Sequence, residues 1–467
     1  MVIEQLVWIR NDLRWQDNPA LYFASLKGPI RVLVIATPKQ WQKHHESEAK
    51  TGLRAGLIRC LFSKLASLGI PADLIEGEYF EQVPNILRQY CQDNAIKHVW
   101  YNQDLPIDER QRDQAVNQAL QAIRIEVHPQ KPDLIVSRPV LSQQGTPFKV
   151  FTPFYKRWLT MLNEQSIEPL LAPKQQADAL DEQPLTIAWQ RPFRDNLWRP
   201  DQDKASQTLW QFCHRKEGQY DEQRDFPMAP GTSTLSPYLA LGALGPRECV
   251  YAITYVCNEQ GRSWQDSVWL KELAWRDFYR QLMGHFPTLS KHHPFKPETD
   301  RIVWRDNKAE QLAWQKGQTG FPIVDAAMRQ LNKTGWMHNR LRMITASFFS
   351  KLLFADWRRG EQYFMSQLID GEFAANNGGW QWSASTGCDA APYFRVFNPT
   401  RQSERYDTNG EFIRRFVPEL KSLDNKSIHN PSAEQRKALG YPSPIVDYQA
   451  ARKAAIEAFD RLKNHSS

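Results

Sequence analysis

The sequence predicts an N-terminal α/β domain built on a parallel sheet, followed by a C-terminal part that is entirely helical. Short β-rich apolar runs occur at Leu6–Ile9, Arg31–Ala36 and His98–Tyr101, and helical stretches such as Val83–Asn94 separate them. Strands joined by connections of that length pair in parallel. From Lys204 onward the sequence shows helical rather than β-rich patterns.

Length and charge limit the classes of protein that the chain can be. With 467 residues it is long enough for two or three domains and a large core. The formal net charge of +7 fits a polyanionic partner, but a weak basic excess is also typical of an ordinary soluble surface. The 17 tryptophans outnumber the 15 tyrosines. Such a content suits stacking on rings or carrying electrons, although large cores use Trp as well.

The six cysteines contain no Cys-x-x-Cys and no Cys/His spacing typical of a metal centre. This predicts a reducing compartment and no bound metal. Charge interrupts the N-terminus at Glu4, too early for a signal peptide, and no run of 18 apolar residues occurs. We therefore expect a cytoplasmic protein, monomeric and without a membrane partner.

Three domains or segments are predicted from composition. Residues 1–130 form the α/β domain, which is Rossmann-like but has no Gly-x-Gly-x-x-Gly after its first strand, so no dinucleotide is held by that loop. Residues 131–200 are rich in proline and read as an interdomain connector. Residues 201–467 form the helical domain.

One stretch of the helical part, Asn376–Pro399, is unusual for a core. Trp380 and Trp382 flank a glutamine, two glycines precede them and small hydroxyl residues follow. An irregular buried loop with tryptophans as core anchors is the plain alternative. Two further stretches, Trp269–Tyr279 and Trp336–Met343, combine aromatics and arginines at helical spacing.

Gly231–Gly242 is a candidate phosphate-binding segment. Its hydroxyl residues and free backbone N–H groups come just before Pro237, which opens a helix. An ordinary N-cap cluster explains the same residues equally well.

Together these stretches resemble the photolyase/cryptochrome family, most closely the class I cyclobutane pyrimidine dimer photolyases. The similarity runs from Leu6–Arg14 to beyond Arg414. The resemblance implies the photolyase/cryptochrome fold, FAD as cofactor and light-dependent repair of DNA. Such an enzyme, a deoxyribodipyrimidine photo-lyase, flips the dimer into its active site and splits it by electron transfer from excited reduced FAD. An antenna chromophore passes light energy to the flavin.

The resemblance assigns one set of residues to FAD. In it, Ser233 and its neighbours contact the pyrophosphate, and Asn376 lies beside flavin N5. An Asn at that position favours a stable reduced flavin. Arg342 suits an internal partner such as Asp370. The expected FAD residues are Tyr220, Thr232, Ser233, Thr234, Leu235, Ser236, Trp269, Arg342, Asp370, Gly371, Glu372 and Asn376.

A second set is assigned to DNA, with Trp275 as a platform for the extruded dimer, Glu272 as its anchor and Arg340 at a backbone phosphate. The expected DNA-binding residues are Arg224, Glu272, Trp275, Arg276, Tyr279, Asn339, Arg340, Trp382 and Gln402. Residues expected in the reaction are Glu272, Asn339, Met343 and the electron relay of Trp380, Trp357 and Trp304. Asn339 and Met343 match the dimer-cleaving members rather than repairers of six-four photoproducts, which carry His at both positions.

The antenna is expected to be a reduced folate, methenyltetrahydrofolate, with a deazaflavin as the alternative. Residues that match the folate pocket are His44, Asp108, Glu109 and Lys291. Glu109 suits the donors of a pterin ring, whereas Asp108 stands where the folate-binding relatives carry Asn. Solvated charged residues at a helix start are the plain interpretation.

Two other classes of function remain open on the sequence. A blue-light receptor would share FAD and the tryptophans but usually adds a long C-terminal tail, and here only a short Ala451–Lys463 helix closes the chain. A plain flavin electron-transfer protein would leave Trp275, Arg340 and Trp382 as core residues.

Overall fold

The computed structural model describes residues 3–181 and 184–464, so the ends of the chain and residues 182 and 183 of the predicted connector lie outside the described part. The chain forms two compact units. The first joins Met1–Gly218 to Ser233–Ser290, and the second joins Gln219–Thr232 to Lys291–Ser467. The three ranges predicted from the sequence, 1–130, 131–200 and 201–467, differ from these two units, and the predicted domain boundaries remain a prediction.

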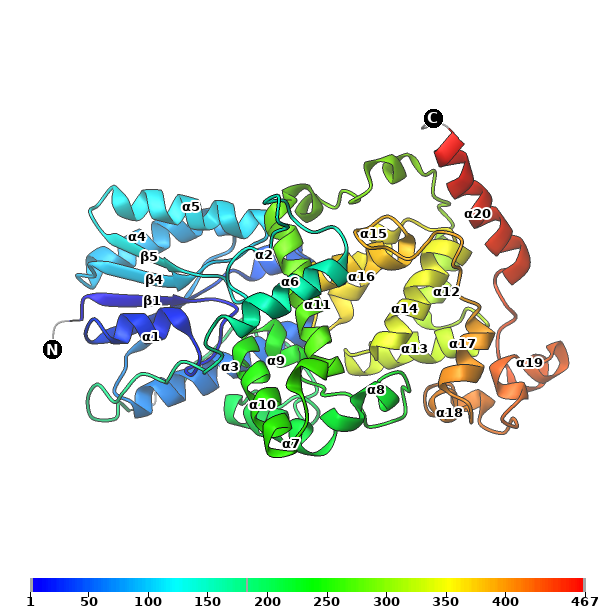
Figure 1. Cartoon of the computed structure of the whole chain (residues 1–467), viewed down its shortest axis with the longest axis horizontal. Coiled ribbons are helices and arrows are strands. Elements are labelled where there is room, and N and C mark those ends of the chain that lie inside the picture. Colours follow the sequence, from blue (N-terminus) through cyan, green and yellow to red (C-terminus); the bar gives the residue numbers. More distant parts are fainter. Residues whose placement is uncertain (1–2, 182–183, 465–467) are drawn as a thin grey trace. The chain divides into compact units, whose positions relative to one another are not determined.

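A five-stranded parallel sheet organises the first unit (Figure 1). Its order is β3-β2-β1-β4-β5, with every neighbouring pair parallel. The α/β prediction is therefore confirmed. The strands are β1 (Gln5–Ile9), β2 (Ile30–Ala36), β3 (Ala72–Glu76), β4 (His98–Asn102) and β5 (Glu126–Gln130).

Helices cover both faces of this sheet, as a parallel sheet requires. Helices α4 (Val83–Asp93) and α5 (Ile107–Gln121) lie on one face, and α1 (Pro19–Ser25) and α3 (Glu48–Ser67) lie on the other (Figure 1). Leu87 of α4 packs there in a buried core with Val99 of the sheet. The other helices of the first unit are α2 (Pro38–Lys43), α6 (Phe151–Asn163), α7 (Gln202–Arg215), α9 (Ser236–Ala240), α10 (Pro246–Glu259) and α11 (Val268–His285).

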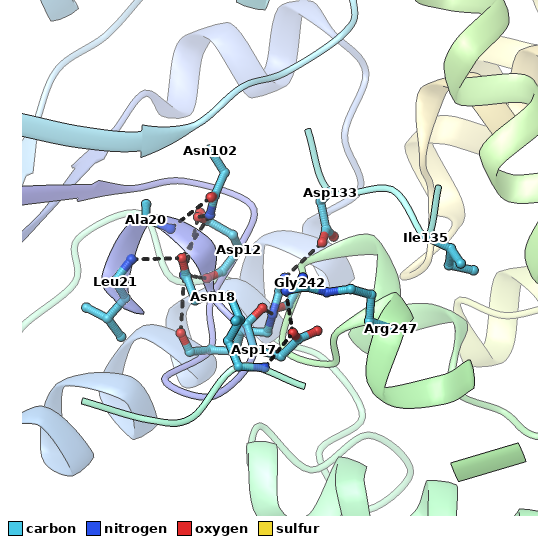
Figure 2. Close-up of polar contacts among 12 residues, drawn as sticks. Asp12, Asp17, Asn18, Ala20, Leu21, Asn102, Asp133, Ile135, Gly242 and Arg247 are labelled. Carbon is cyan, nitrogen blue, oxygen red and sulfur yellow. Dashed lines mark hydrogen bonds and ion pairs between the residues drawn. The ribbon is translucent and has the colours of Figure 1, made fainter. Parts of the chain in front are cut away.

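The loop after β1 is held by a buried polar network (Figure 2). Asn102, at the end of β4, donates to Asp12 and accepts from the backbone N–H of Ala20 at 3.0 Å. Asn18 caps α1 by accepting from the N–H of Leu21 at 3.3 Å. These bonds tie the carboxyl ends of β1 and β4 to the start of α1, so the loop geometry is fixed from two strands at once.

Arg14 extends this network to segments far away in the sequence. Its guanidinium is 1% exposed, donates to the carbonyl oxygens of Asp17 and Gly242 at 3.0 Å each, and pairs with Asp133 at 2.8 Å. Asp17 also pairs with Arg247 (Figure 2). Burial acts to raise the pKa of the Asp133 carboxyl, but the charges of Arg14 and its other cationic neighbours outweigh it and hold the pKa below its usual value.

The second unit is helical, apart from an isolated bridge between Arg305 and Ala355. Its core contains Trp314, Trp357 and Trp380 among many buried apolar side chains. A π-helical turn at Phe348–Leu352 continues α14, a feature found in other proteins at functional sites. The helices are α8 (Tyr220–Gln223), α12 (Lys308–Lys316), α13 (Pro322–Thr334), α14 (Asn339–Ser347), α15 (Trp357–Gln367), α16 (Phe373–Ala384), α17 (Pro399–Tyr406), α18 (Glu411–Phe416), α19 (Ala433–Leu439) and α20 (Tyr448–Asn464).

The stretch Asn376–Pro399 is not an irregular loop throughout, because its first part belongs to α16. Glu372 caps this helix by accepting from the N–H of Ala375 at 2.9 Å, and Ser385 ends it in the left-handed region at φ 65°. Small residues suit a helix packed closely on a neighbour. A Cβ at Gly360 of α15 would collide with the Trp380 indole.

No helix in the described part of the chain is long and apolar enough to cross a membrane.

The carboxylate of Asp277 is a structural acceptor in the first unit. It is fully buried and accepts from the N–H groups of Ile135 (3.2 Å) and Val136 (3.0 Å) and from the Trp158 indole N–H (2.9 Å). Burial raises the pKa of Asp277. Three donors therefore depend on one side chain of α11.

We predict that Asp277→Ala lowers the free energy of unfolding by about 3 kcal/mol or more, because three buried donors lose their acceptor. Urea unfolding measures the loss. Asp266→Ala is the matched control, since Asp266 is exposed and should change stability by less than about 0.5 kcal/mol. Equal losses in the two variants would contradict this role of Asp277.

Candidate active site

A cavity of about 150 Å³ lies in the second unit between α14, α16 and the turn at residues 368–372. The structure brings together eight of the predicted site residues there. They are Asn339, Arg342, Met343, Asp370, Gly371, Glu372, Asn376 and Trp380. The cavity is smaller than the roughly 300–1,000 Å³ typical of whole-ligand sites, so it suits one part of a larger ligand.

Arg342 and Asp370 form the ion pair that the sequence led us to expect. The Arg342 Nη2 atom lies 2.8 and 3.0 Å from the two carboxylate oxygens of Asp370, and Nε donates to the carbonyl of Met337 at 2.8 Å. The Asp370 side chain is 3% exposed and that of Arg342 is 26% exposed. The pair therefore places a fixed, largely neutralised charge in one wall of the cavity.

Asn376 is oriented by a residue that sequence reasoning missed. Its Nδ2 donates to the carbonyl oxygen of Glu361 at 3.0 Å and to the Glu361 carboxylate at 3.3 Å. The Glu361 side chain, 1% exposed, also pairs with His292 at 3.5 Å, and this contact raises the pKa of His292. With its amide N–H₂ engaged by Glu361, the Asn376 oxygen is left to act as an acceptor. Only the packing of α15 on α16 brings these residues together.

Two buried polar atoms next to the cavity lack a hydrogen-bond partner. They are Nε1 of Trp380 and Oγ of Ser383, and both residues line the cavity. Buried polar groups are normally paired. The orphaned atoms, with the Asn376 amide, fit a flat heteroaromatic group such as the flavin ring that the sequence predicts.

The three tryptophans of the expected relay lie in or against one core. Trp380 and Trp357 are buried, and Trp304 is half-buried and packs against that core, with its ring 5.0 Å from Phe354. Trp357 opens α15, and Gly360, which touches the Trp380 ring, comes one helical turn later. Their roles as relay members remain a prediction.

Helix α11 of the first unit carries Glu272, Trp275 and Tyr279 on its partly exposed side. The Trp275 indole is half-buried and stacks on Phe151, with ring centroids 3.7 Å apart and planes 7° apart. Phe151 is a support that the sequence did not point to. Trp269, in the first turn of α11, is buried against Phe212.

Arg276 lies beside these residues but has an internal partner. Its guanidinium donates to the carbonyl of Asp133 at 3.0 Å and lies 3.5 Å from the Asp133 carboxylate. The structure thus gives Arg276 a structural role in addition to the predicted contact with DNA, which remains a prediction.

The predicted phosphate segment spans the boundary between the two units. Tyr220 and Thr232 belong to the second unit, and the Tyr220 ring, 9% exposed, has the Arg224 guanidinium 5.4 Å above it. Ser233, Thr234, Leu235 and Ser236 belong to the first. Thr234 adopts a left-handed conformation at φ 54°, and the N–H of Leu235 donates to the Ser233 hydroxyl at 3.4 Å.

Of the other predicted DNA contacts in the second unit, Arg340 has the best-defined surroundings. It pairs with Asp225 at 2.7 Å, and its guanidinium lies 4.6 Å from the Tyr406 ring. His338 caps α14, and burial lowers its pKa to about 4, so it is a neutral acceptor. Asn339 is exposed, whereas Met343, Trp382 and Gln402 are half-buried.

Three of the four predicted antenna residues, His44, Asp108 and Glu109, form a cluster in the first unit. His44 Nε2 lies 3.1 Å from Asp108 and its Nδ1 lies 3.8 Å from Glu109. Phe80 packs edge-on against His44, and Gln40 contacts Nε2 at 2.8 Å. Burial raises the pKa of Glu109. Lys291, the fourth residue, belongs to the second unit.

Comparisons with known proteins agree with this arrangement. The family model described as DNA photolyase matches residues 5–174, and that described as the FAD binding domain of DNA photolyase matches residues 269–461. The deoxyribodipyrimidine photo-lyase of Escherichia coli K12 is 46% identical over 98% of both chains.

Two solved structures are similar over nearly the whole chain. A class III photolyase of Agrobacterium tumefaciens has a TM-score of 0.84 at 34% identity, covering 99% of this chain and 98% of its own. A cryptochrome of Synechocystis has a TM-score of 0.87 at 27% identity, covering 98% and 99%. With such similarity along its full length, the chain belongs to the photolyase/cryptochrome family.

Proposed function

We propose that the chain is a light-dependent DNA-repair enzyme, a deoxyribodipyrimidine photo-lyase that acts on cyclobutane pyrimidine dimers with FAD as its cofactor. One observation carries the proposal. Asn339 and Met343, which match the dimer-cleaving type, line the same cavity as Asn376, which matches the flavin site, and Trp380, which matches the relay ring nearest the flavin. The full-length similarity to photo-lyases supports it.

The bound FAD supplies the electron that splits the dimer. Residues of the cavity wall would hold and orient its ring: Asn376 offers an oxygen fixed by Glu361, and the Arg342–Asp370 pair offers charged hydrogen-bonding groups in the same wall. Trp380, packed on Gly360, is a buried part of the same wall.

The substrate must leave the base stack before any protein group can reach it, and a dimer's weakened pairing lowers that cost to a few kcal/mol. Trp275, supported on one face by Phe151, supplies a rigid platform for the extruded bases. In the proposed function Glu272 anchors their polar edges, and Asn339 and Met343 of the second unit are the further expected contacts. Arg224 and Arg340 neutralise nearby phosphates.

A blue-light receptor is the alternative function, and the fold alone does not separate the two, since a cryptochrome shares it. Under blue light, a catalytic amount of the protein should convert the dimer in an oligonucleotide to intact pyrimidines. In darkness no conversion should occur. Flavin photoreduction without dimer cleavage would leave the receptor as the better description.

For the antenna we infer a reduced folate, methenyltetrahydrofolate, rather than a deazaflavin. The His44–Asp108–Glu109 cluster supports a ligand with several ring donors, because the carboxyl oxygens of Asp108 and Glu109 can accept hydrogen bonds. We also infer a cytoplasmic monomer. The six cysteines are all free thiols, as expected in a reducing compartment.

We predict that Trp275→Ala lowers affinity for dimer-containing DNA by about 1–3 kcal/mol, the usual worth of one base stacked on an aromatic ring. Flavin absorption should not change, and binding titrations with damaged and undamaged duplex measure the effect. The control is Trp210→Ala, because Trp210 is also half-buried and packs edge-on against Tyr255. Trp275 is a packing residue if its variant binds both DNAs as wild type does.

We predict that Trp380→Phe abolishes light-driven reduction of the oxidised flavin, because an indole in the relay is oxidisable and a benzyl ring is not. Dimer repair should survive in protein whose flavin was reduced chemically beforehand. Trp314→Phe is the control, since Trp314 lies in the same core with its ring 6.0 Å from Trp380. Photoreduction at the wild-type rate in Trp380→Phe would make Trp380 purely structural.

A further inference from the structure

Two histidines and one glutamate meet on the sheet of the first unit, in a place that the proposed function does not use. In the parallel pairing of β4 with β5, His98 lies opposite Glu126 and Trp100 lies opposite His128. Alternate residues of a strand share a face. His98, Glu126 and His128 therefore project from the same face, whereas Val99 and Val127 pack on the other with α4 and α5.

The three side chains direct their ligand atoms at one point. His98 Nδ1 lies 3.1 Å from His128 Nε2 and 3.3 Å from Glu126 Oε2, and His128 Nε2 lies 3.7 Å from the same Oε2. Two atoms bound at about 2.1 Å to one tetrahedral ion lie roughly 3.4 Å apart. All three separations match the edges of such a coordination shell. Among the described residues, His98, Glu126 and His128 are the group of His, Cys, Asp or Glu whose ligand atoms all lie within 4.8 Å of one another.

The surroundings hold one ligand rigidly and leave another open to solvent. His128 stacks flat on Trp100, with centroids 4.1 Å apart, and the Trp100 indole N–H donates to Gln5 at 2.8 Å. Each imidazole is 28% exposed, and Glu126 is 70% exposed. An ion can thus enter from solvent and meet a preformed corner of three ligands.

We propose that His98, Glu126 and His128 form a binding site for a divalent transition-metal ion such as Zn²⁺, with water in the fourth position. Two imidazole nitrogens and a carboxylate oxygen are ligands that such ions prefer over Ca²⁺ or Mg²⁺. The ion cross-links the edge strand β5 to β4. This site belongs to the first unit, and the proposal is independent of the flavin and of DNA repair.

The test uses chelator-treated full-length protein titrated with Co²⁺ as a spectroscopic probe for Zn²⁺. A difference spectrum, which cancels the flavin absorption common to both samples, should show the d–d bands of tetrahedral Co²⁺. One equivalent of Zn²⁺ should remove them. No such bands in the wild-type protein would overturn the proposal, and the three side chains would then be only a hydrogen-bonded and ion-paired cluster.

Variants locate the ion. His98→Ala and Glu126→Gln should each lower Zn²⁺ affinity by at least about tenfold, and Glu126 is exposed enough for its conservative change to leave folding intact. His214→Ala is the control, because His214 also faces a glutamate, Glu259, at 3.9 Å but has no third ligand among the residues that the structure describes. Zn²⁺ should raise the melting temperature of wild type and His214→Ala but not of His98→Ala. Wild-type affinity in both site variants would overturn the assignment.

Discussion

The first unit depends on the hydrogen bonds and the ion pair made by the buried guanidinium of Arg14. A buried charge is tolerated only when its hydrogen-bonding groups are satisfied. Here the carbonyls of Asp17 and Gly242 and the Asp133 carboxylate satisfy them. Because Asp17 and Gly242 come from chain segments more than 200 residues apart, one side chain fixes the loop after β1 against the segment that begins at Ser233. Asp133 also binds Arg276, so the same network reaches the helix that presents Trp275.

In the second unit, close contact between α15 and α16 has the corresponding role. The absence of a side chain at Gly360 lets the Trp380 indole lie against the α15 backbone. That approach also brings the Glu361 carboxylate within reach of Asn376. The orientation of an amide expected at the flavin is thus a consequence of helix packing. His292 pairs with the same carboxylate, and this contact raises the pKa of the imidazole.

Several charged residues expected at DNA already have partners within the protein. Arg340 pairs with Asp225 and Arg276 with Asp133. An arginine held in this way is pre-oriented and loses little side-chain entropy when it meets a phosphate, but it must share its donors. In the proposed contacts with DNA, each of these arginines therefore contributes geometry fixed in advance more than net charge, which is only weakly basic for the whole chain.

Periodic apolar patterns and long motifs are local properties of the chain, so they were enough to predict the parallel sheet, the helical second part and the family. The sequence also anticipated the Arg342–Asp370 pair and eight residues of one cavity. It did not reveal that α16 extends into the Asn376–Pro399 stretch, since a helix of small residues needs a neighbour's packing to form. Nor did it reveal Glu361 behind Asn376, or the His98–Glu126–His128 group, because these contacts come from helix packing and strand register. Only the tertiary structure decides such contacts, since distance along the chain carries no information about them.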